Sequence, residues 1–239
     1  MNTHTGEPPA ARQPGYVALT FDDGPTEHTP DLLRALRAAR ARATLFNVGA
    51  HAARHPDLVH AQRRAGMWIG NHSHTHPHLT ELGAAAAFEE IARAQRVLRR
   101  INGRAPVLFR PPYGETDDAV GAAAARLGLR EVLWTVDTRD WDGASTTEIV
   151  AAAETVRPGG IVLMHDGYRA TVEAVPRIVR ALVERGLRPG RIGFRGGDQP
   201  VAAAPWQLPP YPPAQPVRPS PEAPETPEAP ETEAPELSP

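Results

Sequence analysis

Short apolar segments alternate with longer stretches rich in Ala and Arg between residues 15 and 195. The longer stretches carry apolar residues at helical spacing: in 29–40, Leu32, Leu33 and Leu36 share one face, and 172–185 shows the same pattern. Short apolar segments between such helices are typical of parallel strands joined by helical crossovers. The predicted strands are 16–21, 43–48, 67–70, 107–110, 131–136 and 160–164, with a weaker one at 191–194.

Polar residues follow directly after most of these strands. The polar segments are 20–25, 71–72, 110–113, 137–141 and 165–166. In a barrel of parallel strands and helices, these strand ends meet on one face, where active sites form. The pattern therefore predicts an α/β fold with a closed or nearly closed barrel of six or seven strand–helix units, although an open doubly wound sheet would give a similar rhythm.

Composition narrows the chemistry. The 239 residues are 41% hydrophobic, enough for one sizeable core, and the formal charge of −2 gives no reason to expect nucleic acid as a partner. No apolar run approaches the length of a membrane span. The chain has no cysteine, so a bound metal ion must use His and carboxylate ligands.

The two ends of the chain differ from its middle. Residues 1–14 lack the basic and apolar regions of a secretory signal, and we expect a flexible leader there. From Gly196 onward the chain holds about half of its 27 prolines, and Glu-Ala-Pro-Glu recurs at 222–225, 228–231 and 233–236. We therefore predict a catalytic domain at 15–195 and a disordered Pro/Glu/Ala-rich tail at 196–239, which acts as a spacer or simply keeps the protein soluble.

Asp22 and Asp23 are adjacent carboxylates at the end of a predicted strand, and Gly24 and Pro25 turn the chain after them. Successive strand residues point in opposite directions, so the two acids are expected to have different roles. One can bind a metal ion while the other acts as a base. Taken alone, the same four residues also fit a turn that caps the next helix.

Four histidines stand at alternate positions in 71–79, after another predicted strand. His72 and His76 are four residues apart, so on a helical turn they would lie on one side and could bind the same ion. His74 and His78 are then expected to be exposed loop residues.

Four further residues offer chemistry. His165 ends the apolar strand at 160–164 and is well placed as a proton donor, although a histidine there can also be a purely structural core residue. Asp140 could orient an imidazole, and Trp141 offers an aromatic face to a sugar. Arg110 could hold a carboxylate with two hydrogen bonds or form a structural ion pair.

In chain order, these segments resemble the five motifs of the NodB-like polysaccharide deacetylases, carbohydrate esterase family 4. The resemblance covers about residues 15–190. Within the family, the sequence around the motifs is most similar to bacterial acetylxylan esterases and chitooligosaccharide deacetylases. Five ordered motifs are far more specific than any one of them. The matching residues are 20–24, 72–73 with 76, 110–113, 140–141 and 163–165.

The resemblance implies a distorted (β/α)7 barrel that binds one divalent ion, zinc or alternatively cobalt, through Asp23, His72 and His76. It implies that the enzyme removes acetyl groups from a polysaccharide or oligosaccharide, such as acetylxylan, chitooligosaccharides or peptidoglycan. Members of the family are mostly exported, so the resemblance implies an extracellular or cell-wall location. We expect a monomer.

The resemblance also assigns roles to the remaining site residues. Many esterase relatives carry Trp after the His-Asp pair where this chain has Gly167 and Tyr168, which makes the substrate preference an open question. The implied roles are Asp22 as general base oriented by Arg110, His165 as general acid tuned by Asp140, the Tyr113 amide as oxyanion donor, and Trp141 with Leu163 as the pocket for the acetyl methyl group.

Two other functions fit part of the pattern. Two histidines and one carboxylate also describe the metal site of non-haem iron oxygenases, which typically use an antiparallel barrel. A glycan-binding module on a deacetylase fold that has lost its activity is the second alternative. The presence of base, acid and all three ligands together argues against that loss.

Overall fold

Strand β1 (Gly15–Gly24) lies at the centre of the sheet in the computed structural model, which describes residues 15–195 and 199–204. It pairs in parallel with β2 (Thr44–Asn47), with β7 (Ile161–His165) and, at its start, with β8 (Leu187–Arg195). The β1–β7 register sets Asp22 beside His165. Two of the polar strand ends predicted from the sequence are therefore direct neighbours.

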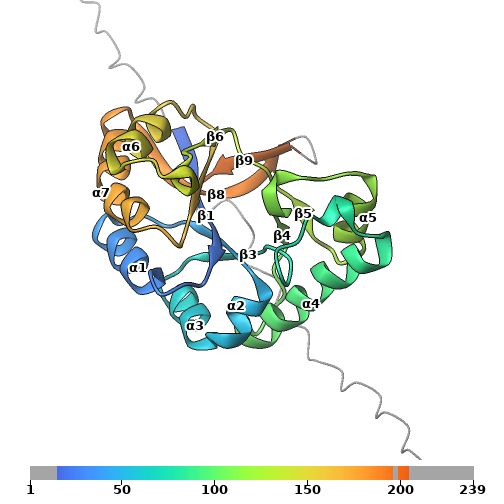
Figure 1. The fold of residues 1–239 in the computed structure, drawn as a ribbon. Coiled ribbons are helices and arrows are strands. Elements are labelled where there is room, and N and C mark those ends of the chain that lie inside the picture. Colours follow the sequence, from blue (N-terminus) through green and yellow to red (C-terminus); the bar gives the residue numbers. More distant parts are fainter. Residues whose placement is uncertain (1–14, 196–198, 205–239) are drawn as a thin grey trace, which may run out of the picture.

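The other strands extend the sheet in the order β5-β4-β3-β2-β1-β7-β6, all parallel. Their bounds are β3 (Trp68–Asn71), β4 (Leu108–Phe109), β5 (Arg130–Glu131) and β6 (Val136–Asp137). Among the described residues, β5 and β6 do not pair with each other, so the curled sheet is a barrel left open at one side (Figure 1). The predicted α/β barrel fold is confirmed in this open form.

The single strand predicted at 131–136 is wrong. The amide of Val132 donates to Phe109 O on β4 at 2.8 Å, whereas the amide of Thr135 donates to Ile161 O on β7 at 2.9 Å. The segment therefore changes partner midway and crosses the open side of the barrel. An apolar pattern cannot reveal this change, because it depends on which strands lie at either side of the gap.

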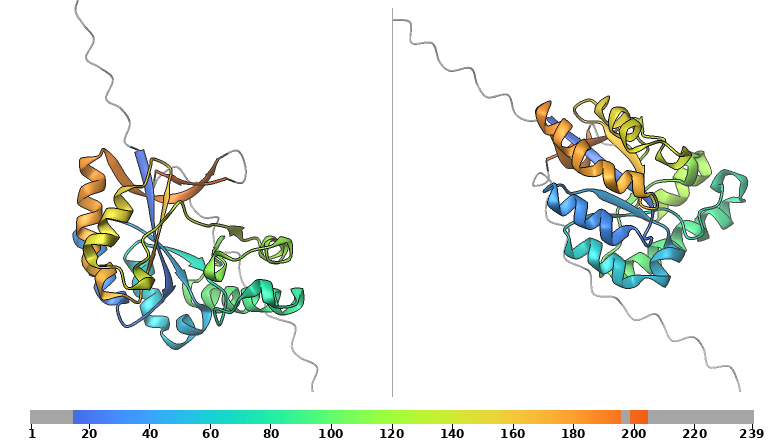
Figure 2. Two further views of the ribbon diagram at one scale, coloured as in Figure 1. Left: turned by 45° about the horizontal axis from the view of Figure 1, so that its top comes forward. Right: turned by 60° about the vertical axis from the view of Figure 1, so that its left-hand side comes forward.

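Helices surround the outside of the curled sheet (Figure 2). The amphipathic segments predicted at 29–40 and 172–185 are helical, although the first ends earlier and the second begins earlier than predicted. Three short 3₁₀ turns, Leu79–Glu81, Pro112–Gly114 and Asp140–Asp142, lie in the loops at the strand ends. The helices are α1 (Thr29–Ala38), α2 (Gly49–Arg54), α3 (Pro56–Arg64), α4 (Ala84–Asn102), α5 (Asp118–Arg126), α6 (Thr146–Glu154) and α7 (Arg169–Glu184).

The largest apolar core lies under the long central strands. Phe21 on β1 and Met164 on β7 pack there with Leu36 of α1 and Ile178 of α7, and all four are fully or almost fully buried. Burying one such side chain contributes about 1.5–3 kcal/mol. A separate, smaller cluster around Phe109 packs α4 and α5 against the short strand β4. The two sides of the site are thus supported by cores of different size.

Strand β9 (Gln199–Ala203) pairs antiparallel with β8, with Phe194 opposite Pro200. The disordered tail predicted at 196–239 is wrong for residues 199–203, which form this strand. Proline is tolerated here because β9 pairs with β8 alone among the described strands and is an edge strand. The predicted leader at 1–14 and the repeats at 222–236 lie outside the described residues. No helix in the described part of the chain is long and apolar enough to cross a membrane.

Candidate functional site

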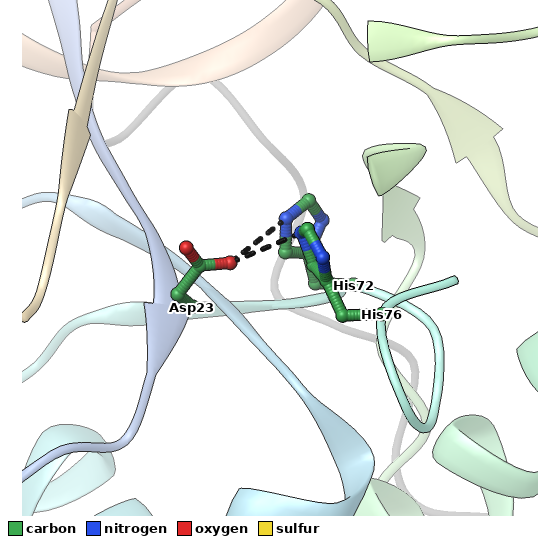
Figure 3. A group of neighbouring side chains, drawn as sticks. All are labelled: Asp23, His72 and His76. Atoms are coloured by element: carbon green, nitrogen blue, oxygen red, sulfur yellow. Dashed lines mark ion pairs between the residues drawn. The ribbon is translucent and has the colours of Figure 1, made fainter. Parts of the chain in front are cut away.

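Asp23, His72 and His76 come together at the carboxyl end of the central strands, with one ligand atom of each within 4.8 Å of the others. Asp23 is at the end of β1, and the two histidines lie in the loop that follows β3. Oδ1 of Asp23 is 3.4 Å from Nε2 of His72 and 3.2 Å from Nε2 of His76. Figure 3 shows the carboxylate facing both imidazole rings. The structure thus brings together the three residues expected to bind a metal ion.

The loop that carries the histidines is irregular, so the expectation that they lie on a helical turn is wrong. Ser73 and His76 have positive φ angles of 59° and 63°. The amide of Ser73 donates to Asn71 Oδ1 at 3.0 Å, and the amide of His76 donates to Ser73 Oγ at 3.1 Å. These local hydrogen bonds replace helical ones and turn both imidazoles toward Asp23.

The tautomer of His72 follows from its hydrogen bond. Its Nδ1 lies 2.7 Å from the carbonyl oxygen of Arg110, which can only accept, so Nδ1 carries the proton. The lone pair of Nε2 therefore faces Asp23 in the neutral ring. Metal-binding histidines are commonly oriented in this way by a second hydrogen bond.

The three residues fit a divalent cation. Oδ1 of Asp23 is buried and has no hydrogen-bond partner among the described residues. Burial raises the pKa of Asp23, but His72 and His76 outweigh burial and hold this pKa well below its usual range. A divalent cation can replace the imidazole protons among these three groups, because one ligand atom of each lies within 4.8 Å of the others. Two nitrogens and one oxygen are a ligand set found in catalytic zinc sites.

The neighbouring Asp22 is held in a different way. Its side chain is buried, and Oδ1 accepts a 2.8 Å hydrogen bond from Nη1 of Arg110, while Oδ2 lies 3.7 Å from Nε2 of His72. The fully buried guanidinium also donates to Thr20 Oγ1 and to the carbonyls of Val132 and Leu133. Burial lowers the pKa of Arg110, and the charge of Asp22 partly offsets it. Arg110 thus fixes one carboxylate oxygen of Asp22 beside the three ligands.

His165 ends β7 on the other side of the site and is bound to Asp140. Its Nδ1 is 2.7 Å from Asp140 Oδ1, and its amide donates to Asp140 Oδ2 at 2.7 Å. Thr171 Oγ1 donates to the same Oδ2 at 2.6 Å. Burial lowers the pKa of His165, but Asp140 outweighs burial and raises it above its usual value. The ring is therefore suited to carry a proton near neutral pH.

The two most exposed aromatic residues of the site lie in the loops that follow β4 and β6. Tyr113 is 54% exposed and has a positive φ of 59°, and its ring centroid lies 4.7 Å from that of His76. Trp141 is 48% exposed, whereas Leu163 on β7 is buried. Tyr168 is partly exposed, and its ring lies edge-on to His165 at 6.1 Å.

The two remaining histidines of the run differ from each other. His78 is exposed, as predicted, and it stacks on Tyr113 at 4.0 Å and bonds to Glu115 Oε2 at 2.9 Å. The prediction that His74 is exposed is wrong, because it is only 5% exposed. It packs against the start of α2, where a Cβ at Gly49 would lie 2.6 Å from Nδ1 of His74. Neither residue joins the three candidate ligands.

Several supporting groups were not predicted from the sequence. They include the hydroxyl groups that complete the hydrogen bonding of the buried charges, and the carboxylate of Asp166, whose pKa burial raises to about 6. The position of Asp166 directly after a histidine at a strand end was the available signal. The unpredicted residues are Thr20, Thr29, Thr171 and Asp166.

Fold and site together define a parallel α/β barrel with two imidazoles and a carboxylate around one point, an arrangement suited to metal-assisted hydrolysis. Residues 10–132 match the family model described as polysaccharide deacetylase. The chain is 42% identical over 180 residues to a bifunctional xylanase/xylan deacetylase of Cellvibrio japonicus, covering 74% of this chain and 27% of that protein. It is 37% identical over 188 residues to a chitooligosaccharide deacetylase of Bradyrhizobium sp. (strain ANU 289), covering 72% and 86%.

Solved structures agree with these matches. A family 4 carbohydrate esterase from Streptomyces lividans, in complex with acetate, is 49% identical with a TM-score of 0.77, and the match covers 80% of this chain and 98% of that one. The chain therefore belongs to the polysaccharide deacetylase family. The fold also resembles a CE4 family pseudoenzyme from Bacillus anthracis, at 27% identity and a TM-score of 0.71, over 74% of this chain and 63% of that one.

Proposed function

We propose that the protein is a zinc-dependent deacetylase that hydrolyses acetyl groups on a polysaccharide or oligosaccharide and releases acetate. The observation that carries this proposal is the placement of Asp22 and His165, on paired strands, around the cluster of Asp23, His72 and His76. The proposed base, the proposed acid and the candidate metal ligands all lie at the carboxyl ends of the parallel strands. This argues against a glycan-binding module without activity, and the parallel sheet argues against a non-haem iron oxygenase.

The bound ion would polarise the acetyl carbonyl and make water more acidic. Asp22 takes the proton from the attacking water, and Arg110 fixes this carboxylate through the 2.8 Å hydrogen bond. The amide of Tyr113 donates to the developing oxyanion, a type of donor worth roughly 100- to 1,000-fold in rate. The amides of the next two residues, Gly114 and Glu115, are already used within this turn, where they donate to the carbonyl oxygens of Pro111 and Pro112.

His165 then donates its proton to the leaving nitrogen or oxygen of the sugar. Asp140 supports this step because it fixes the ring through Nδ1, which leaves Nε2 to face the substrate. Trp141 and Leu163 form the apolar surface that receives the acetyl methyl group. Acetate and the deacetylated sugar leave the site.

The same machinery can act on O-acetyl esters and N-acetyl amides. The names of the relatives support xylan and chitooligosaccharides as candidate substrate classes, and a peptidoglycan-N-acetylglucosamine deacetylase of Listeria monocytogenes, 34% identical over 185 residues, adds peptidoglycan. Xylan and peptidoglycan lie outside the cytoplasm, and on this ground we propose that the protein acts extracellularly or in the cell wall. The loops that follow β4 and β6 would select the substrate, since their aromatic residues are exposed.

Asp22→Asn tests the proposed mechanism, because asparagine keeps the size of the side chain and cannot accept the proton. We expect acetate release to fall by roughly 100- to 10,000-fold, the range for a positioned acid or base. Zinc content should stay near the wild-type value, whereas the melting temperature should fall, because the buried Arg110 loses the charge that offsets its own. Asp118→Asn, at the exposed start of α5, is the matched control and should be fully active. Near-normal activity of Asp22→Asn would refute the assignment of the base.

A further inference from the structure

Asp166 carries a buried carboxylate that the proposed mechanism does not use. It is 1% exposed and follows His165 directly. The two consecutive side chains contact different elements: His165 bonds to Asp140, whereas Asp166 bonds to Thr29 at the start of α1. Asp166 therefore lies between the end of β7 and the loop that joins β1 to α1.

Hydrogen bonds tie this loop to Asp166 at two points. Thr29 Oγ1 donates to Asp166 Oδ2 at 2.6 Å and accepts from the amide of Thr26 at 2.8 Å. Thr26 Oγ1 donates to the carbonyl oxygen of Asp166 at 3.0 Å and accepts from the amide of His28 at 3.1 Å. Because each hydroxyl group uses its single proton toward Asp166, both threonines are directed by this one residue.

Asp166 also contacts the chain on both sides of Asp23. Its amide donates to the carbonyl oxygen of Asp22 at 3.0 Å. A Cβ at Gly24 would lie 2.5 Å from Asp166 Oδ2, so glycine allows the carboxylate to approach the backbone there. Asp23 itself has a φ of 68°, a left-handed conformation that is unfavourable for a residue with a side chain. Such a conformation persists only where the surroundings hold it.

We propose that Asp166 and Thr29 are positioning residues that hold Asp23 in this conformation, and thereby keep its carboxylate oxygen beside His72 and His76. The inference depends on the proposed metal site and adds a group that lies outside it. Without the hydrogen bond from Thr29, the β1–α1 loop keeps only the Thr26 bond of its two side-chain hydrogen bonds to Asp166, and Asp23 relaxes toward a more favourable φ. The ligand oxygen then moves away from the two imidazoles, while the Arg110–Asp22 pair stays intact.

Thr29→Val and Thr29→Ser form a matched pair for the test, made in the full-length protein. Valine keeps the volume of this fully buried side chain and removes the hydroxyl group, whereas serine keeps the hydroxyl group. The measurement is the Kd for zinc, obtained by competition with a chromophoric chelator. We expect Thr29→Val to weaken zinc binding by about 10- to 100-fold, which is the usual effect of removing a residue that orients a metal ligand. Thr29→Ser should bind zinc nearly as tightly as the wild type.

The melting temperature of the metal-free protein separates positioning from a merely structural role. A structural role predicts that Thr29→Val lowers the melting temperature and leaves the zinc Kd unchanged, and that result would overturn the inference. If Thr29→Val does not fold, the half-buried Thr26 provides the second test. Thr26→Val should weaken zinc binding relative to Thr26→Ser, and equal Kd values for the two would overturn the inference. A wild-type protein that binds no zinc would instead refute the proposed function.

Discussion

The two sides of the site are built differently. Asp22 and His165 are at the ends of β1 and β7, which pair over five residues above the largest core. Tyr113 and Trp141 lie in loops that follow β4 and β6, strands of only two residues each. On the first side the side chains are mostly buried and fixed by Arg110 and Asp140, whereas on the second the aromatic rings are about half exposed.

In the proposed function, this difference places proton transfer on the strand side and most of the substrate recognition on the loop side. Proton transfer requires groups held within hydrogen-bond reach, and the paired strands provide that rigidity. Loops tolerate change in length and sequence, so one catalytic side can serve different glycans. We therefore expect substitutions on the strand side to reduce kcat, and substitutions on the loop side to affect mainly KM.

The largest effect is expected when the metal ligands are removed. The double variant His72→Ala and His76→Ala should lose both bound zinc and acetate release, because Asp23 alone cannot hold the ion. Metal analysis after dialysis and an acetate assay measure the two losses. His78→Ala is the control and should keep its zinc, since His78 is exposed and does not join the ligands. Stoichiometric zinc in the double variant would place the metal site elsewhere.

Asp140→Asn should have the next largest effect and should change the pH profile. Asp140 raises the pKa of His165 against the effect of burial, so the neutral amide lowers that pKa. A general acid is active below its pKa and loses activity as the pH rises through it. The alkaline limb of the kcat profile should therefore move to lower pH. At the optimal pH, kcat should fall by less than the roughly 100- to 10,000-fold that the general acid itself supplies. An unchanged alkaline limb would remove His165 from this role.

Trp141→Ala should have a smaller effect, on the loop side. Removing the indole opens the surface proposed for the acetyl methyl group, and we expect kcat/KM to fall roughly 10-fold, as for loss of a small apolar contact. Steady-state kinetics should show most of the loss in KM, and Trp141→Phe should retain most of the activity. A loss confined to kcat would contradict the division between the two sides.

The sequence predicted the strand side better than the loop side. The apolar runs that end in Asp22 and His165 form strands of ten and five residues, and the three residues expected to bind a metal ion come together. The segment 131–136 was mispredicted because its two ends bond to different strands. Strand β9 was missed because the many prolines of residues 196–239 suggested a disordered tail. The hydrogen bond between Thr29 and Asp166 joins residues 137 positions apart, so no local pattern reveals it.

The central claim is tested most directly by removing all metal from the purified protein, restoring zinc, and measuring acetate released from acetylxylan and from chitooligosaccharides. We predict negligible release from the metal-free protein and restored release from at least one substrate, with the ratio of the two rates identifying the preferred class. Equal release with and without zinc, or none from either substrate by a folded, zinc-loaded protein, would contradict the account.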